Sequence, residues 1–235
     1  GTRMQSAAIP AVALPKQPRV YLIDQPGAVQ ANLYVGQLMP STRDPNTTKL
    51  EFANSVLGGE FSSRLNMNLR EDKHWAYGSY SWLNNAQGQR PWMAFAAVQI
   101  DKTAESLAEM RREITDFADG KAPPSAEEVQ KIQAVEIRGL PGSYETVGSV
   151  MGTIGGIVRY QRPDDYVLVR KAEIEGLDAA QVAGAAKAID PDALTYVVVG
   201  DLSKIEQSVR ALNIGEVSIV DADGKPVESS ASKAK

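Results

Sequence analysis

The chain contains no cysteine, one histidine and no excess of basic residues, and each shortage excludes a class of function. Without cysteine there are no disulfides, so the hydrophobic core alone must stabilise the fold. A catalytic zinc site of the His-x-x-Glu-His type needs two imidazoles, and His74 is the only one. A net charge of −4 leaves no surplus of Lys and Arg for phosphates. We therefore expect no nucleic-acid partner and no attraction to an anionic membrane.

Long apolar runs are also absent. No run reaches the roughly 18 residues of a membrane-spanning helix, so we expect no membrane insertion. The opening Gly-Thr-Arg-Met lacks a signal-peptide pattern and is typical of an excision point, so we interpret the chain as a piece of a longer protein. Since the lack of cysteine suits cytoplasm and periplasm alike, the compartment stays open. The periplasm is slightly favoured if the parent chain carries a signal peptide.

The length and composition predict one large domain, or at most two small ones, because 43% of 235 residues are hydrophobic. Residues 1–18 are expected to be a linker or remnant, because Pro10, Pro15 and Pro18 interrupt any regular period. Residues 19–220 are expected to form the domain. The polar, small-residue tail 221–235 is expected to be disordered because it cannot bury enough surface.

The first half of the domain alternates strands and helices. Residues 20–24 and 29–36 are rich in β-formers around a Pro-Gly turn, which predicts a hairpin. Asp44 followed by Pro45 predicts the start of a helix that Gly58–Gly59 ends. A second helix is predicted over 62–71, with Phe61, Leu65 and Leu69 on its buried face and Arg64, Asn68 and Glu71 on its polar face.

Two antiparallel strands are then predicted over 76–83 and 92–100. Strict alternation in the first strand would place Tyr77 on the same side as Ser79, Ser81 and Leu83. A helix follows on the sheet, with its apolar residues at helical spacing and Gly120 at its end. These residues are Leu107, Met110, Ile114 and Phe117.

The second half is mainly helical. Ser125–Glu128 and Ser203–Glu206 both match the capping-box pattern at a helix start. Further helices are predicted over 144–160, 164–175 and 178–188, with strands over 194–199 and 216–220. The order of elements predicts an α+β fold. We expect a two-layer sandwich of a mainly antiparallel sheet with helices packed on one face.

Three possible sites give way to simpler interpretations. His74 is expected to be a partly exposed loop residue, since its Glu-x-x-His spacing has no second copy to complete a di-iron site. The serines at 62, 63, 79 and 81 lack a G-x-S-x-G elbow, and His74 would be their only base. Four glycines at 148, 152, 155 and 156 match no phosphate loop, and their spacing predicts one helix face packed closely on a neighbour.

The segment 57–81, LGGEFSSRLNMNLREDKHWAYGSYS, resembles the carboxy-terminal, non-zinc domain of the M16 metallopeptidases (pitrilysin, insulinase, mitochondrial processing peptidase). The late strand LTYVVVGD is also similar to the closing strand of that family's domains. The resemblance implies a LuxS/MPP-like fold, covering about residues 19–201. It also implies that Arg70 and Tyr77 contact the substrate backbone near the scissile bond, facing a zinc ion held by another domain.

The resemblance implies no catalytic or metal-binding residue in this chain, and it places the zinc in a His-x-x-Glu-His domain on the same or another chain. The function implied is the substrate-binding half of a zinc endopeptidase, which holds an extended peptide as an added strand at a free sheet edge. Two alternatives stay open. The chain is a purely structural or docking module, or Arg70 pairs with Glu71 or Asp72 while Tyr77 simply packs.

Overall fold

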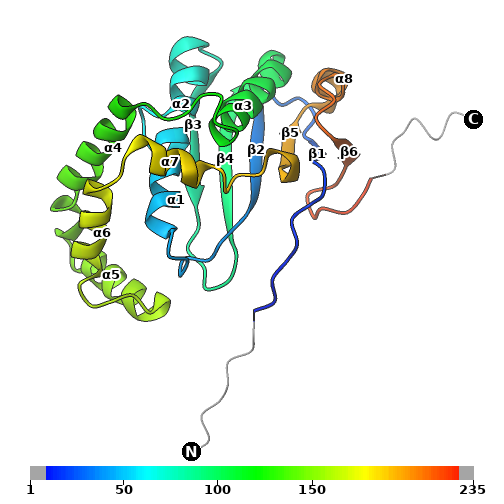
Figure 1. Ribbon diagram of the computed structural model, residues 1–235. Helices are drawn as coiled ribbons and strands as arrows, with labels where there is room; N and C mark the ends of the chain where they lie inside the picture. The colour runs from blue at the N-terminus through cyan, green and yellow to red at the C-terminus, as the bar shows by residue number, and fades with distance from the viewer. Residues whose placement is uncertain (1–8, 228–235) are drawn as a thin grey trace, which may run out of the picture.

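The structure, a computed structural model, describes residues 9–227 and contains one six-stranded sheet with helices on one face (Figure 1). The strand order is β3-β4-β2-β5-β1-β6. The strands are β1 (Arg19–Asp24), β2 (Gln30–Met39), β3 (Ala76–Leu83), β4 (Arg90–Gln99), β5 (Thr195–Gly200) and β6 (Glu216–Ile219).

The helices bear out the two-layer α+β prediction. They are α1 (Thr47–Asn54), α2 (Arg64–Asn66), α3 (Thr103–Ala118), α4 (Ala126–Gly139), α5 (Val147–Tyr160), α6 (Tyr166–Glu175), α7 (Ala179–Ala186) and α8 (Leu202–Ala211), with π-helical turns η1 (Ser55–Gly59) and η2 (Met67–Asp72). The helix predicted to begin at Asp44 starts instead at Thr47, after a turn over 44–46. It continues through η1 and ends at Gly59, because Glu60 is extended.

The sheet is mixed, and the predicted hairpin between the first two strands is wrong. β5 lies between β1 and β2, parallel to β1 and antiparallel to β2. The Pro-Gly turn is present, with the Ala28 amide donating to the Gln25 carbonyl at 3.1 Å, but it connects strands that are not neighbours. The run Val197–Val199 presents apolar side chains to both faces of the sheet. Such a strand buries the most apolar surface in the middle of a sheet. If β1 and β2 were adjacent, β5 could not lie between them.

One face of the sheet carries the core. Leu33 on β2, Trp92 on β4 and Tyr196 on β5 are fully buried beneath the helices. The predicted apolar face of α3 is buried against them. Gly120, with φ of 73°, follows the end of α3 as predicted. The helical spacing of α3 therefore located the helix layer correctly.

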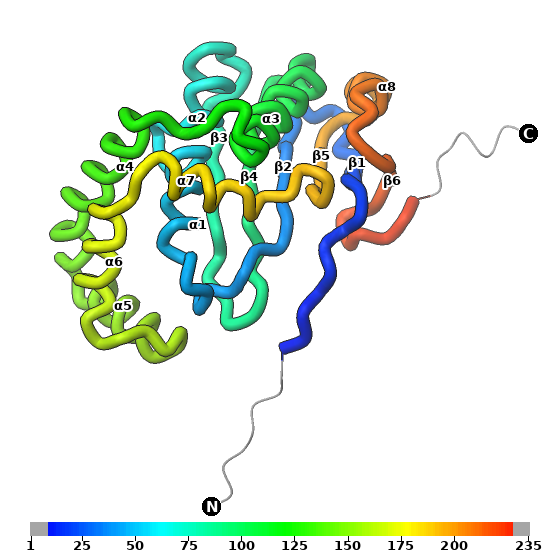
Figure 2. Tube along the Cα trace, viewed as in Figure 1, coloured from blue at the N-terminus to red at the C-terminus, as the bar shows by residue number. Residues whose placement is uncertain are grey.

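Helices α4, α5 and α6 form an arm beside the β3 end of the sheet (Figure 2). The Ser125–Glu128 capping box is present at the start of α4. The second predicted box is wrong, because the N-cap of α8 is Asp201, whose carboxylate accepts from the Ser203 amide at 3.2 Å. The same carboxylate also accepts from the Gly27 amide at 3.1 Å. This contact with the β1–β2 turn favours Asp201 over Ser203 as the N-cap of α8.

The ends of the described chain contact the sheet. The segment 9–18 has no helix or strand, and Val12 exchanges backbone hydrogen bonds with the Gln89 side chain at 2.6 and 3.0 Å. Residues 221–227, predicted as part of a disordered tail, form a turn in which the Asp221 carboxylate accepts hydrogen bonds from the Asp223 and Lys225 amides. The rest of the tail, 228–235, lies outside the described residues. Within residues 9–227 no helix has the length and apolar character needed to cross a bilayer.

Candidate functional site

The segment from α2 to β3 reverses through a left-handed turn at His74. His74 has φ of 57°, and the Lys73 and Trp75 amides close the helix end on the Asn68 and Leu69 carbonyls, both at 3.0 Å. The exposed His74 ring lies 2.9 Å from the Arg70 carbonyl through Nδ1. His74 is thus a loop residue, as predicted. Its turn brings the end of η2 beside the start of β3.

A β-bulge at the start of β3 decides where Tyr77 points. Ala76 pairs with Val98 and Ser79 pairs with Ala96, so β3 holds one residue more than β4 over this stretch. The predicted alternation therefore fails at Tyr77. Its side chain does not join Ser79 on the buried face but is 83% exposed. Bulges commonly re-aim a side chain in this way.

Arg70 and Tyr77 lie together with a third residue, Phe61. The Arg70 guanidinium carbon is 4.6 Å from the Phe61 ring centroid and 5.3 Å from the Tyr77 centroid. Arg70 Nε also lies 3.2 Å from a Glu71 carboxylate oxygen, an ion pair in which both side chains are partly exposed. The rings hold the guanidinium by cation–π contact, and within residues 9–227 its other N–H groups are free to meet a ligand.

The three residues Phe61, Arg70 and Tyr77 are called the Arg70 cluster below. The buried position predicted for Phe61 is wrong, since its side chain is 56% exposed. Sequence reasoning therefore missed its place in the cluster. The available signal was its position nine residues before Arg70, in the loop that precedes α2 rather than on the helix. The alternative interpretation is that Arg70 pairs with Glu71 or Asp72 while Tyr77 packs. The Arg70–Glu71 pair is present, but Tyr77 does not pack in the core.

The outer edge of β3 is partly closed. The Ser79 amide donates to Asn66 Oδ1 at 3.1 Å, and the Ser81 carbonyl accepts from Asn54 Nδ2 at 3.1 Å. Gly58 lies so close to Ser81 that a Cβ there would be 2.7 Å from the Ser81 nitrogen. A peptide therefore cannot add as a strand along the whole of β3, and the expected free edge is limited to the end that carries Tyr77.

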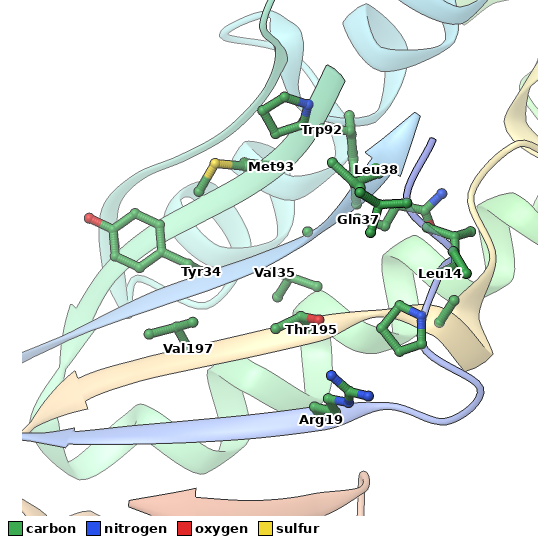
Figure 3. Close-up of a pocket in the computed structure, with 16 residues that line it drawn as sticks. Leu14, Arg19, Tyr34, Val35, Gln37, Leu38, Trp92, Met93, Thr195 and Val197 are labelled. Atoms are coloured by element: carbon green, nitrogen blue, oxygen red, sulfur yellow. The ribbon is translucent and has the colours of Figure 1, made fainter. Parts of the chain in front are cut away.

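A cavity of about 390 Å³ opens on the sheet face opposite the helices (Figure 3). Tyr34, Met93 and Val197 line it from the strands, and the segment 12–15 forms another wall. The Tyr34 and Phe95 rings pack with centroids 4.9 Å apart on this face. Sequence reasoning missed this cavity. The signal was the apolar character of both faces of the central strands.

The other sequence candidates do not form sites. Ser79 Oγ donates to the Phe95 carbonyl at 3.1 Å and Ser81 Oγ to Asn54 Oδ1 at 2.7 Å, so both are structural. On α5, no atom lies within 4 Å of the position that a Cβ would occupy on Gly152 or Gly155, so the predicted close packing of that helix face is absent in residues 9–227. Over the same residues no three His, Cys, Asp or Glu side chains converge, and the residues present do not fit a zinc ion.

A charged network joins three helices to the sheet. The fully buried Arg90 contacts Glu51 at 3.1 Å, and Arg170 joins Glu51 at 3.4 Å and Glu136 at 3.0 Å. Burial alone would lower the pKa of Arg170, but Glu136 and Glu51 outweigh it and raise this pKa. The network links α1, β4, α4 and α6. Its two arginines are balanced by two glutamates and Arg90 Nη2 is buried without a hydrogen-bond partner, so we interpret the network as structural.

Comparisons with known proteins place the chain in context. The family described as the peptidase M16 inactive domain matches residues 5–135. A peptidase M16 inactive domain from Pseudomonas fluorescens is 25% identical with a TM-score of 0.74, over 83% of this chain and 46% of that one. No curated protein matches the chain.

Two further structures share the fold at lower identity. A protease from Helicobacter pylori is 18% identical with a TM-score of 0.70, over 83% of this chain and 48% of that one. The periplasmic protease PqqL from Escherichia coli is 16% identical with a TM-score of 0.62, over 79% of this chain and 21% of that one. The chain spans less than half the length of each of these three structures.

Proposed function

The chain belongs to the peptidase M16 inactive-domain family, and on this premise we propose that it is the non-catalytic, substrate-binding half of a zinc endopeptidase. The partner in this proposal is a zinc-bearing M16 domain on the same or another chain. The two halves together enclose an extended peptide. In this proposal the zinc belongs to the partner, since no three His, Cys, Asp or Glu side chains converge within residues 9–227.

The observation that carries the proposal is the Arg70 cluster. The bulge turns Tyr77 outward to 83% exposure, so packing in the core does not account for its position. Within the described chain, the ring flanks a guanidinium that has only one carboxylate partner, Glu71. An exposed aromatic residue that positions an arginine in this way is typical of a binding surface rather than of packing.

The chemistry of the cluster suits a peptide backbone. The Arg70 guanidinium and the Tyr77 hydroxyl are both hydrogen-bond donors, and peptide carbonyls are acceptors. Donors placed near a scissile carbonyl also stabilise the negative charge that develops on its oxygen during cleavage. In this proposal the cluster positions the substrate and supports that charge. The attacking water and its activation belong to the zinc-bearing half.

The test is the peptidase activity of the assembled enzyme, in which this chain is combined with its zinc-bearing half. We expect Arg70→Ala or Tyr77→Phe to lower kcat/KM by about 10–1000-fold, the scale of losing one such donor, with little change in Tm. The matched controls are Arg210→Ala, which removes an exposed arginine paired with Glu206, and Tyr80→Phe on the same strand. Both should leave activity unchanged.

The competing proposal, a docking module without proteolysis, predicts a different pattern. Under it, no zinc-bearing half forms a peptide-cleaving complex with the chain. Normal kinetics together with a clear loss of stability in Arg70→Ala and Tyr77→Phe would assign both residues to the structure instead.

A further inference from the structure

Two arginines line a cavity of about 410 Å³ beside the glycine face of α5. Gly152, Gly155 and Gly156 form one side of the cavity, and Arg159 and Arg162 follow at the end of the helix. Because these glycines have no side chains, the cavity reaches the backbone of α5. The glycine spacing that predicted helix packing thus produces an open space within the described chain.

Arg162 is held in place by aromatic rings rather than by a carboxylate. Its guanidinium carbon lies 4.0 Å from the Tyr166 ring centroid and 5.3 Å from the Tyr160 centroid. Nη1 also lies 3.8 Å from the position of a Cβ on Gly156. The backbone supports this placement, since Gln161 adopts φ of 55° and the Arg162 amide donates to the Ile157 carbonyl at 3.0 Å.

The Arg162 guanidinium forms no ion pair within the described chain. Among residues 9–227 no carboxylate lies within 4.0 Å of the Arg162 or Arg159 side chains, and neither donates a side-chain hydrogen bond. A third arginine strengthens the positive field, because Arg43 Nη2 donates to the Arg159 carbonyl at 3.1 Å. In a chain of net charge −4, this is a local concentration of unpaired positive charge.

We propose that this cavity binds the carboxylate of a peptide, with Arg162 as the main contact and Arg159 as the second. A guanidinium stacked on rings keeps its N–H edge available, and that edge matches a carboxylate in two parallel hydrogen bonds. The volume suits one residue of a peptide rather than a lone ion. The Tyr144 and Tyr166 rings supply the apolar wall that a side chain of the peptide would contact.

The tyrosines also supply donors. A tyrosine is protonated at neutral pH in any case, and burial, with the nearby Glu51 adding to the effect, raises the pKa of Tyr166 further. A protonated hydroxyl donates to a carboxylate, whereas a phenolate would repel it. The inference needs no zinc-bearing half. It concerns binding by this chain alone, so its test does not depend on whether the proposed peptidase function is correct.

Isothermal titration of the purified chain tests the inference with four probes. These are acetyl-Gly-Gly-Leu with a free carboxylate, the same peptide as its amide, acetyl-Gly-Glu-Gly-amide with a side-chain carboxylate, and inorganic phosphate. We expect the first or third to bind and the amide not to bind. Arg162→Gln should weaken binding by about 10–100-fold, the scale of losing a charge-assisted hydrogen-bonded pair.

A second variant covers the case in which Arg162→Gln fails to fold. Gly152→Leu keeps every charge and places a side chain in the cavity from a position whose Cβ has open space around it. It should abolish binding while Tm stays the same or rises. The matched charge control is Lys187→Gln, an exposed lysine on another helix end, which should leave binding unchanged.

Several results would overturn the inference. Equal binding of the amide would show that the carboxylate is not recognised, and tighter binding of phosphate would show a general anion site. An equal loss in Lys187→Gln would show non-specific attraction. Failure of all four probes, or full binding by Gly152→Leu, would remove the cavity as the site.

Discussion

Gly58 is the residue whose replacement tests the packing of the helix layer on β3 most directly. In Gly58→Ala the new Cβ would contact Ser81 Oγ and lie 2.7 Å from the Ser81 nitrogen and 2.8 Å from its Cβ. Two of these atoms belong to the side chain of a strand residue and one to its backbone, so no flexible group is available to move away. Either η1 or β3 must shift.

The magnitude follows from two opposing terms. Alanine is favoured over glycine in a helix by about 1 kcal/mol. Overpacking a close contact costs about 1–3 kcal/mol, and a shift of Ser81 also strains its hydrogen bonds to Asn54, each of which contributes about 1 kcal/mol. The clash outweighs the propensity. We expect a net loss of about 2 kcal/mol in the free energy of unfolding, or about 4–8 °C in Tm for a chain of this size.

The assay is urea unfolding followed by tryptophan fluorescence, because Trp92 is fully buried beside this contact and hydrogen-bonded to Asn54. The matched control is Gly184→Ala in α7, where no atom lies within 4 Å of the Cβ position. That variant gains the helix propensity without a clash, so it should be more stable by about 0.5–1 kcal/mol. If Gly58→Ala were as stable as the unchanged chain, the close approach of η1 to Ser81 would be wrong.

Two further predictions concern other contacts of the fold, and a third concerns the chemistry of the isolated chain. Asn54→Ala leaves the Trp92 indole N–H and the Ser81 hydroxyl without their partner, so it should lower the free energy of unfolding by about 3 kcal/mol, measured by urea unfolding. Glu128 has a lowered pKa, because burial, which alone would raise it, is outweighed by the hydrogen bond from Arg64. The ionised Glu128 therefore stabilises the fold fully above the ordinary carboxyl pKa, and this stabilisation is lost as the pH falls through the lowered pKa. In thermal melts between about pH 3 and 6, the Tm of Glu128→Gln should depend less on pH than the Tm of the unchanged chain. The purified chain should hydrolyse no peptide and bind zinc only weakly, and stoichiometric tight zinc by atomic absorption would contradict this.

Local patterns in the sequence determined most of the elements. The helical spacing of Leu107 to Phe117 and the capping box at Ser125 predicted α3 and α4, because each depends on neighbours within a few residues. The strand β3 was predicted over the same residues that the structure shows, 76–83. The two residues expected to bind the substrate, Arg70 and Tyr77, do lie together, since a short turn separates them in the chain.

Only the tertiary structure decided the features that depend on distant residues. β5, from the far end of the chain, separates β1 from β2, and the Gly27 amide helps to select Asp201 rather than Ser203 as the cap of α8. The bulge that exposes Tyr77 exists only because β3 pairs with β4. Sequence spacing reports which face a residue shares within its own element. It does not report which element covers that face, because packing across the whole chain decides this. That packing leaves Phe61 exposed and the glycine face of α5 open.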